Sequence, residues 1–317
     1  MIVSNQLEIK TVIDNTAATP FVIGEWGLSI WINTGDKQIL FDTGAGNTGV
    51  LLHNLEVLNI SVLDIDVIVL SHGHQDHTGG LRPLLRKMHQ LDPNKEIEII
   101  CHPAAMEPQY VKNIGSFGCP YTKEELERYG ARFRYITKPY YIDENIVVSG
   151  EVAMTNDFET TGMAFFREFN TTSGLGEKSV SKEDLAFDPL FKQFQQDTNV
   201  LDDMALYLKT DLGLMVILGC AHRGAINTIN HGQAVTGIDQ VFLIIGGTHT
   251  AGVTAERMNA TVNSLKSIGV KKVGVSHCTG LVASCILSQK LGREVFFNNN
   301  AGAVIRFEKN QLKVNEF

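Results

Sequence analysis

Residues 71–80 read Ser-His-Gly-His-Gln-Asp-His-Thr-Gly-Gly and place four potential metal ligands within six positions. They follow the apolar run 65–70, which is short and rich in β-branched residues and is therefore predicted to be a buried strand. A strand that ends in a glycine-flanked loop with imidazoles and a carboxylate is a natural platform for metal ions. The alternation of His72 and His74, followed by Asp76 and His77, lets one loop serve two metal ions.

The composition narrows the class of protein. The 317 residues suffice for one large α/β domain or two smaller ones. The net charge of −8, without a cluster of Lys and Arg, argues against a nucleic-acid partner. Five scattered cysteines argue against a disulfide framework. Residues 1–10 do not resemble a signal peptide, and no run is long enough to span a membrane. We therefore expect a cytoplasmic protein without a membrane partner, and we leave homo-oligomerisation open.

Apolar periodicity predicts strands in both halves of the chain with helices between them. Two polar, irregular segments, at about 103–145 and 168–203, are predicted to be caps or insertions on a single domain that spans residues 1–317. The predicted strands are 7–13, 28–32, 38–41, 65–70, 96–101, 204–209, 214–218, 241–245, 272–276, 294–297 and 303–307. The predicted helices are 47–58, a helix starting near Pro83, 222–235, 252–267 and 279–290.

Three more histidines follow predicted strands in the second half of the chain. His222, His249 and His277 each come just after an apolar run and close to a glycine. A single histidine at a strand end is more often structural than a ligand. Metal sites, however, draw their ligands from several elements, so the cluster at 71–80 makes these three its candidate partners.

With these features the chain resembles the metallo-β-lactamase superfamily. The resemblance rests on residues 71–80, on Phe41-Asp42-Thr43-Gly44 and on the strand ends at 219–224, 246–249 and 277–280. Within the superfamily, the pairing of these strand ends resembles the 7,8-dihydropterin-6-yl-methyl-4-(β-D-ribofuranosyl)aminobenzene 5′-phosphate synthase-like subfamily. The resemblance implies an αβ/βα fold, in which two mixed β-sheets flanked by helices form a four-layer sandwich with the metal site at one edge.

The resemblance also implies a ligand set and the residues around it. We expect Asp42 to accept the free N–H of a ligating histidine and so to fix its orientation, although a turn-capping aspartate is the alternative. The implied ligands are His72, His74 and His222 for one divalent ion, and Asp76, His77 and His277 for the other.

Four positions depart from the pattern or extend it. Cys220 stands where many members carry a bridging aspartate; it is either a thiolate ligand, which favours zinc, or a small buried residue. Glu151 is the alternative to His222 as a third ligand. Arg223 is either a surface arginine or a group that holds a substrate anion. Trp26 occupies a position where the subfamily often has histidine.

The expected activity depends on two bound divalent ions. We expect these ions to be zinc, with manganese or iron as the alternatives. Metal-bound hydroxide would attack a small anionic ester or phosphoester, with Asp76 orienting the nucleophile. His249 would protonate the leaving group or bind the developing oxyanion. The alternatives are a synthase-type transferase that joins a dihydropterin to a ribosylaminobenzene phosphate, a nuclease of the same superfamily, and a non-catalytic module that binds a metal or ligand.

Overall fold

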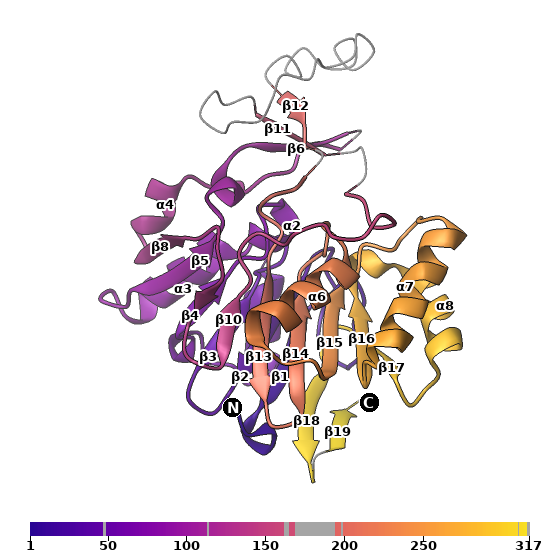
Figure 1. Cartoon of the computed structure of the whole chain (residues 1–317). Coiled ribbons are helices and arrows are strands. Elements are labelled where there is room, and N and C mark those ends of the chain that lie inside the picture. The colour runs from indigo at the N-terminus through magenta and orange to yellow at the C-terminus, as the bar shows by residue number, and fades with distance from the viewer. Residues whose placement is uncertain are drawn as a thin grey trace.

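The computed structural model describes residues 1–46, 49–112, 114–161, 165–168, 194–197, 199–309 and 311–315. Two large β-sheets pack face to face, and helices cover the outer surface of each (Figure 1). This arrangement confirms the predicted four-layer αβ/βα sandwich. Within the described residues, no helix is both long and apolar enough to cross a membrane.

The first sheet has eight strands in the order β19-β18-β1-β2-β3-β4-β5-β8. Strands β3, β4, β5 and β8 run parallel, and the others pair antiparallel. Helices α1 (Val50–Val57) and α3 (Leu81–Leu91) pack on its outer face. The strands are β1 (Glu8–Ile13), β2 (Ser29–Asn33), β3 (Gln38–Phe41), β4 (Val67–Val69), β5 (Ile97–Cys101), β8 (Ala131–Tyr135), β18 (Val304–Glu308) and β19 (Gln311–Asn315).

The second sheet has seven strands in the order β17-β16-β15-β14-β13-β10-β9. Strands β14 to β17 run parallel. Helices α6 (Ala225–Thr236), α7 (Ala255–Ile268) and α8 (Leu281–Leu291) cover its outer face. The strands are β9 (Tyr140–Tyr141), β10 (Ile146–Val148), β13 (Ala205–Thr210), β14 (Gly213–Leu218), β15 (Val241–Gly247), β16 (Lys272–Ser276) and β17 (Phe296–Asn298).

Side-chain alternation along the strands explains why the layers pack. Val67 and Val69 of β4 enter the core between the sheets, whereas Ile68 packs against the helices of the first sheet. Met215 and Ile217 of β14 likewise enter the central core. Because strands covered on both faces bury every side chain, they appear in the sequence as continuous apolar runs.

The two segments predicted as caps differ in how much of each the structure describes and in where it lies. Within 103–145, helix α4 (Lys123–Glu127) leads into β8, which extends the first sheet, and β9 extends the second. Only β6 (Gln109–Val111) and β7 (Gly115–Ser116) join β11 (Phe165–Glu168) and β12 (Phe194–Gln196) in a separate small sheet, drawn at the top of Figure 1. Most of segment 168–203 lies outside the described residues.

Candidate metal centre

The predicted ligands converge because parallel strands bring their carboxyl ends to one edge of each sheet. Strands β3 and β4 deliver Asp42 and residues 71–80, and β14, β15 and β16 deliver the three later histidines. Non-glycine residues with positive φ gather at these ends, namely Asp42 (62°), Ala221 (52°), His249 (48°) and His277 (52°). Such backbone conformations are costly and cluster at functional sites.

Three histidines form the first triad: His72 and His74 from the loop after β4, and His222 from the segment after β14. His72 Nε2 lies 2.9 Å from His74 Nδ1 and 3.3 Å from His222 Nε2. All three are buried, and burial lowers the pKa of His72 and His222 and brings that of His74 to about 4. The imidazoles are therefore neutral, which is the form that binds metal.

The second triad consists of Asp76, His77 and His277. Asp76 and His77 lie on the short helix α2 (Gln75–Thr78), and His277 follows β16. The Nε2 atoms of the two histidines are 3.2 Å apart, and Asp76 Oδ2 lies 3.3 Å from His277 Nε2. Burial raises the pKa of Asp76, but His77 and His277 outweigh burial and leave the carboxyl ionised. Burial lowers the pKa of His77, but Asp42 and Asp76 outweigh burial and raise it to about 9. The second triad therefore contains an ionised carboxylate, a group that the first triad lacks.

Asp42 lies directly behind the second triad. Its Oδ2 is 2.6 Å from His77 Nδ1 and accepts the Ser71 hydroxyl at 2.7 Å, while its Oδ1 accepts the Ser71 backbone N–H at 2.7 Å. An acceptor on Nδ1 fixes the histidine tautomer and turns Nε2 toward the metal position. These contacts support the orienting role proposed for Asp42.

His277 is held by two residues that sequence reasoning missed. Asn15 Oδ1 lies 3.0 Å from His277 Nδ1, and Asp14 Oδ1 accepts the His277 backbone N–H at 2.6 Å. Both residues directly follow β1. The carboxyl ends of β1 and β3 lie at the same edge of the first sheet, because both strands pair antiparallel with β2. A polar pair at the end of a predicted strand was the only signal available for them.

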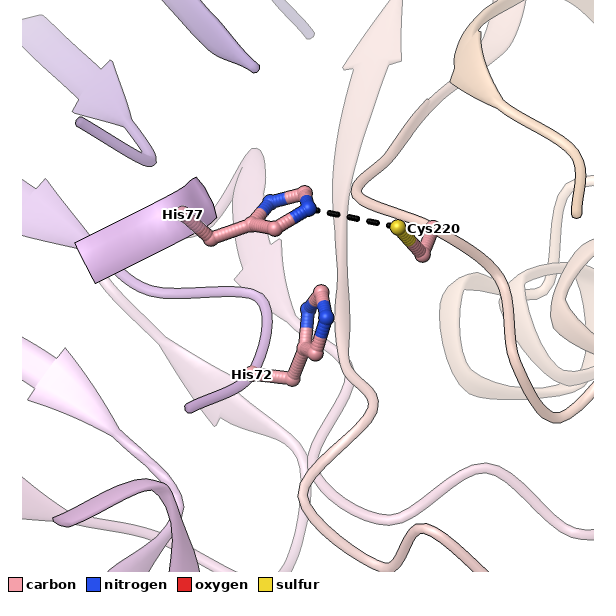
Figure 2. Close-up of side chains that lie close together, drawn as sticks. All are labelled: His72, His77 and Cys220. Carbon is pink, nitrogen blue, oxygen red and sulfur yellow. Dashed lines mark hydrogen bonds between the residues drawn. The ribbon is translucent and has the colours of Figure 1, made fainter. Parts of the chain in front are cut away.

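Cys220 lies between the two triads. Its Sγ is 3.2 Å from His77 Nε2, and it shares a potential ligand group with His72 and His77 (Figure 2). Burial raises the pKa of the Cys220 thiol. A second thiol, Cys278, donates to the Cys220 carbonyl at 3.4 Å. The cysteine thus lies where the resemblance placed a bridging group.

His249 lies beside the first triad, with its ring centroid 4.3 Å from that of His222. Its Nδ1 is buried and has no hydrogen-bond partner among the described residues. It joins Cys220 and His222 in a further potential ligand group. His249 is thus within reach of the centre, and its position is compatible with either role considered for it.

Glu151 and Arg223 are directed elsewhere. Glu151 Oε1 lies 3.3 Å from His102 Nε2, and within the described residues no potential metal group includes it. The Arg223 guanidinium donates to the backbone carbonyls of Val152 and Asn199. Its Nε and Nη1 atoms are therefore engaged by the chain itself, and a contact with a substrate anion stays a prediction.

The small sheet covers the first triad through a buried ionic network. Asp202 accepts the Gly73 backbone N–H at 2.8 Å and the Arg167 guanidinium at 2.6 Å. This contact holds β11 so that Phe165 stacks on His74, with ring centroids 5.2 Å apart, and also contacts His222. Sequence reasoning missed the network because its members come from the irregular segments.

Glycines allow the ligand-bearing loop, residues 71–80, to lie against the loop that follows β3. A Cβ on Gly79 would lie 2.0 Å from the Ala45 carbonyl oxygen, and one on Gly80 would lie 2.1 Å from that of Thr43. The Thr43 backbone N–H also donates to the His77 carbonyl at 2.8 Å. Only glycine fits at these two positions, and this contact sets α2 against Asp42.

The donor set fits divalent cations. Each triad presents three ligand atoms within 4.8 Å of one another. The imidazole nitrogens face each other, and within the part of the chain that the structure describes the buried Asp76 Oδ1 has no hydrogen-bond partner, so these atoms lack the protons to satisfy one another. A cation resolves this arrangement, and imidazole, carboxylate and thiolate together suit zinc, iron or manganese.

Comparison with known proteins places this geometry in a family. Residues 27–88 match the model of the metallo-beta-lactamase superfamily. The chain is 31% identical, over 96% of its length and 97% of the relative, to the 7,8-dihydropterin-6-methyl-4-(beta-D-ribofuranosyl)-aminobenzene-5'-phosphate synthase of Methanocaldococcus jannaschii. It is 32% identical to an uncharacterized protein of the same organism, over 89% of this chain and 94% of that protein. A solved metal-dependent hydrolase of the beta-lactamase superfamily superposes with a TM-score of 0.74 at 22% identity, covering 96% of this chain and 100% of the hydrolase.

Proposed function

Since the chain belongs to the metallo-β-lactamase superfamily, a family of enzymes, we propose that it is a metal-dependent hydrolase of small anionic esters or phosphoesters. The observation that carries the proposal is the pair of triads, which brings six ligand atoms from three strand ends around Cys220. Two divalent ions bound there would lower the pKa of a coordinated water to near neutrality and supply the nucleophile.

The residues of the chain have separate tasks in this reaction. Asp42, Asn15 and Asp202 hold the ligand-bearing segments in place. Asp76 orients the attacking water through its second oxygen, Oδ1, which forms no hydrogen bond with any described residue. In the hydrolysis, the oxygen of water bonds to the carbonyl carbon or phosphorus as the ester bond breaks. His249, beside the first triad, gives a proton to the departing oxygen.

We propose zinc as the resident ion, with manganese and iron as the alternatives. A neutral all-histidine triad and a thiol between the sites suit a borderline metal such as zinc. Metal binding would deprotonate Cys220 despite its burial, because a thiol coordinates as the thiolate. The substrate we propose is a small anionic molecule rather than a nucleic acid, since the net charge is −8.

The test is the double substitution His72→Ala/His74→Ala. We expect the variant to lose bound metal by elemental analysis and to lose hydrolysis of bis(p-nitrophenyl) phosphate and p-nitrophenyl acetate. The matched control is His53→Ala/His89→Ala, which removes two histidines of α1 and α3 and is expected to retain both properties. Full metal content in the first variant would refute the assignment. A metal-loaded protein that hydrolyses neither ester would favour a non-catalytic binding module.

A second candidate is a synthase-type reaction that joins a dihydropterin to a ribosylaminobenzene phosphate. The 31% identity to the synthase, which extends over 96% of the chain, favours it. The metal-loaded protein would be incubated with the ribosylaminobenzene phosphate and a dihydropterin whose side-chain carbon carries a leaving group such as diphosphate. The new bond to that carbon would form as its bond to the leaving group breaks, and the joined product would be sought by mass spectrometry. A product that forms with the wild-type chain and not with His72→Ala/His74→Ala would favour this reaction over simple hydrolysis.

A further inference from the structure

An exposed tryptophan stands at the rim of the second triad. Trp26 lies in the connection between β1 and β2, and its indole Nε1 donates to Asp76 Oδ2 at 3.1 Å. Its ring meets that of His277 edge-on, with centroids 5.8 Å apart. The residue is nevertheless 62% exposed. One edge of the indole is thus engaged with two candidate ligands while much of its surface faces solvent.

The backbone around Trp26 is fixed. Asn15 Oδ1 accepts the Gly27 backbone N–H at 3.0 Å and lies 3.0 Å from His277 Nδ1, so one amide oxygen ties this connection to the second triad. The Leu28 backbone N–H donates to the Asp76 carbonyl at 3.2 Å. Gly27, with φ of 149°, has no room for a Cβ, which would lie 2.4 Å from that same oxygen. The indole is therefore presented from a rigid position.

Within the described residues, the first triad offers no comparable exposed aromatic surface. Phe165 stacks on His74 and contacts His222 and His249, so the aromatic side chain there is packed on the histidines themselves. Exposing a large apolar ring to water is unfavourable, and a rigid, exposed tryptophan is the type of residue that anchors ligands. Stacking on a planar ring removes that surface from water without disturbing the N–H bond to Asp76.

We propose that the exposed surface of Trp26 binds a planar aromatic ring of the substrate, while its N–H positions Asp76. This inference deepens the proposed function by naming a substrate class: an anionic ester that carries a flat aromatic or heteroaromatic ring. It rests on the proposed function for the identity of the reacting centre. Trp26 is thus both a ring-binding surface and a positioning residue for the second triad.

Calorimetric titration of the metal-loaded protein tests the ring-binding role. The probe is pterin, a planar heteroaromatic, and ribose 5-phosphate serves as an anion without an aromatic ring. We expect Trp26→Ala to weaken pterin binding about tenfold or more and Trp26→Phe to change it about threefold or less, since phenylalanine keeps a stacking surface. Ribose 5-phosphate binding should be unchanged in both. The control is Trp31→Phe, because Trp31 is buried on β2.

Cobalt titration tests the positioning role separately. Trp26→Phe removes the N–H donor, so the affinity of the second triad for Co²⁺, followed in the visible spectrum, should fall by about 10- to 100-fold. Trp26→His, which restores a donor, should recover part of that loss. Unchanged Co²⁺ affinity in Trp26→Phe would overturn the positioning role.

Failure of this inference can be told apart from failure of the proposed function, because neither titration requires turnover. Equal pterin affinities in wild type and Trp26→Ala would overturn the ring-binding role even if ester hydrolysis is observed. Indole emission that shifts to the blue as protein concentration rises, without probe, would show that a second copy covers Trp26, and this too would overturn it. Loss of hydrolysis with pterin binding intact would count against the proposed function alone.

Discussion

The two triads differ in charge and in what supports them. The first is composed of neutral imidazoles beneath Phe165, and no described residue forms a hydrogen bond with His222 Nδ1. The second includes the ionised Asp76, has Asp42 behind His77, and opens to solvent at Trp26. A divalent ion gains from the nearby negative charge and from oriented ligands. We therefore expect the second triad to bind metal first and with higher affinity. We expect the first triad to determine which metal the protein selects.

The largest effect should come from replacing Asp76 with alanine. The second triad would lose its charged ligand, so we expect one metal equivalent to disappear and ester hydrolysis to fall by more than about a thousandfold, since a catalytic ion supplies several kcal/mol. Elemental analysis and steady-state assays would measure this. Asp36→Ala, an exposed aspartate in the β2–β3 turn, is the control. If two equivalents remain bound, the division into two triads is wrong.

A smaller effect should follow from Asp202→Asn, which loosens the cover of the first triad. The change weakens a buried pairing with Arg167, so we expect a loss of about 2–4 kcal/mol in the free energy of unfolding at pH 7, measured with urea. Burial raises the pKa of Asp202, but Arg167 outweighs burial and holds it below the usual range.

The pH dependence of that loss follows from the direction of the shift. A carboxyl with a depressed folded-state pKa stabilises the fold fully above its unfolded pKa of about 4 and loses this contribution as the pH falls further. Wild type and Asp202→Asn should therefore differ by a constant amount above about pH 5 and converge toward pH 2. A difference that grows from pH 5 to 8 would contradict this account.

The smallest effect should come from Asp42→Asn, which keeps the shape of the side chain. His77 would lose its charged acceptor, and we expect the Co²⁺ affinity of the second triad to fall by about 10- to 100-fold while that of the first changes little. Competitive titration with a chelator would measure both. A drop of equal size in the first triad would show that the two triads are one coupled site rather than two.

Much of this arrangement is predictable because it depends on local patterns. The run 65–70 and the segment 71–80 identify a strand that ends in ligands, and parallel strands then require His222 and His277 to reach the same edge. The four-layer architecture is what the resemblance to the superfamily implies, and the apolar runs buried on both faces agree with it. The sequence pattern thus predicts which elements meet, and the structure adds which atoms face one another.

The remainder could not be predicted because it depends on contacts between distant positions. Asn15 lies 262 positions from His277, and Asp202 lies 129 positions from Gly73, so no local pattern links them. Strand β8 reads Ala-Arg-Phe-Arg-Tyr, and this polar pattern, which is common in edge strands, does not distinguish it from a cap segment. The sequence offers Glu151 as an alternative third ligand to His222, whereas in the structure the Glu151 carboxyl lies beside His102.

The contact between Gly79–Gly80 and the backbone of residues 43–45 has a consequence for protein engineering. The ligand-bearing loop 71–80 cannot be grafted into another protein alone. The recipient must also place a backbone segment, without intervening side chains, directly against these two glycines. A graft would have to include residues 41–46 together with 71–80, because the two segments pack against each other. Libraries that vary this centre should therefore hold both segments constant and diversify the rim around Trp26.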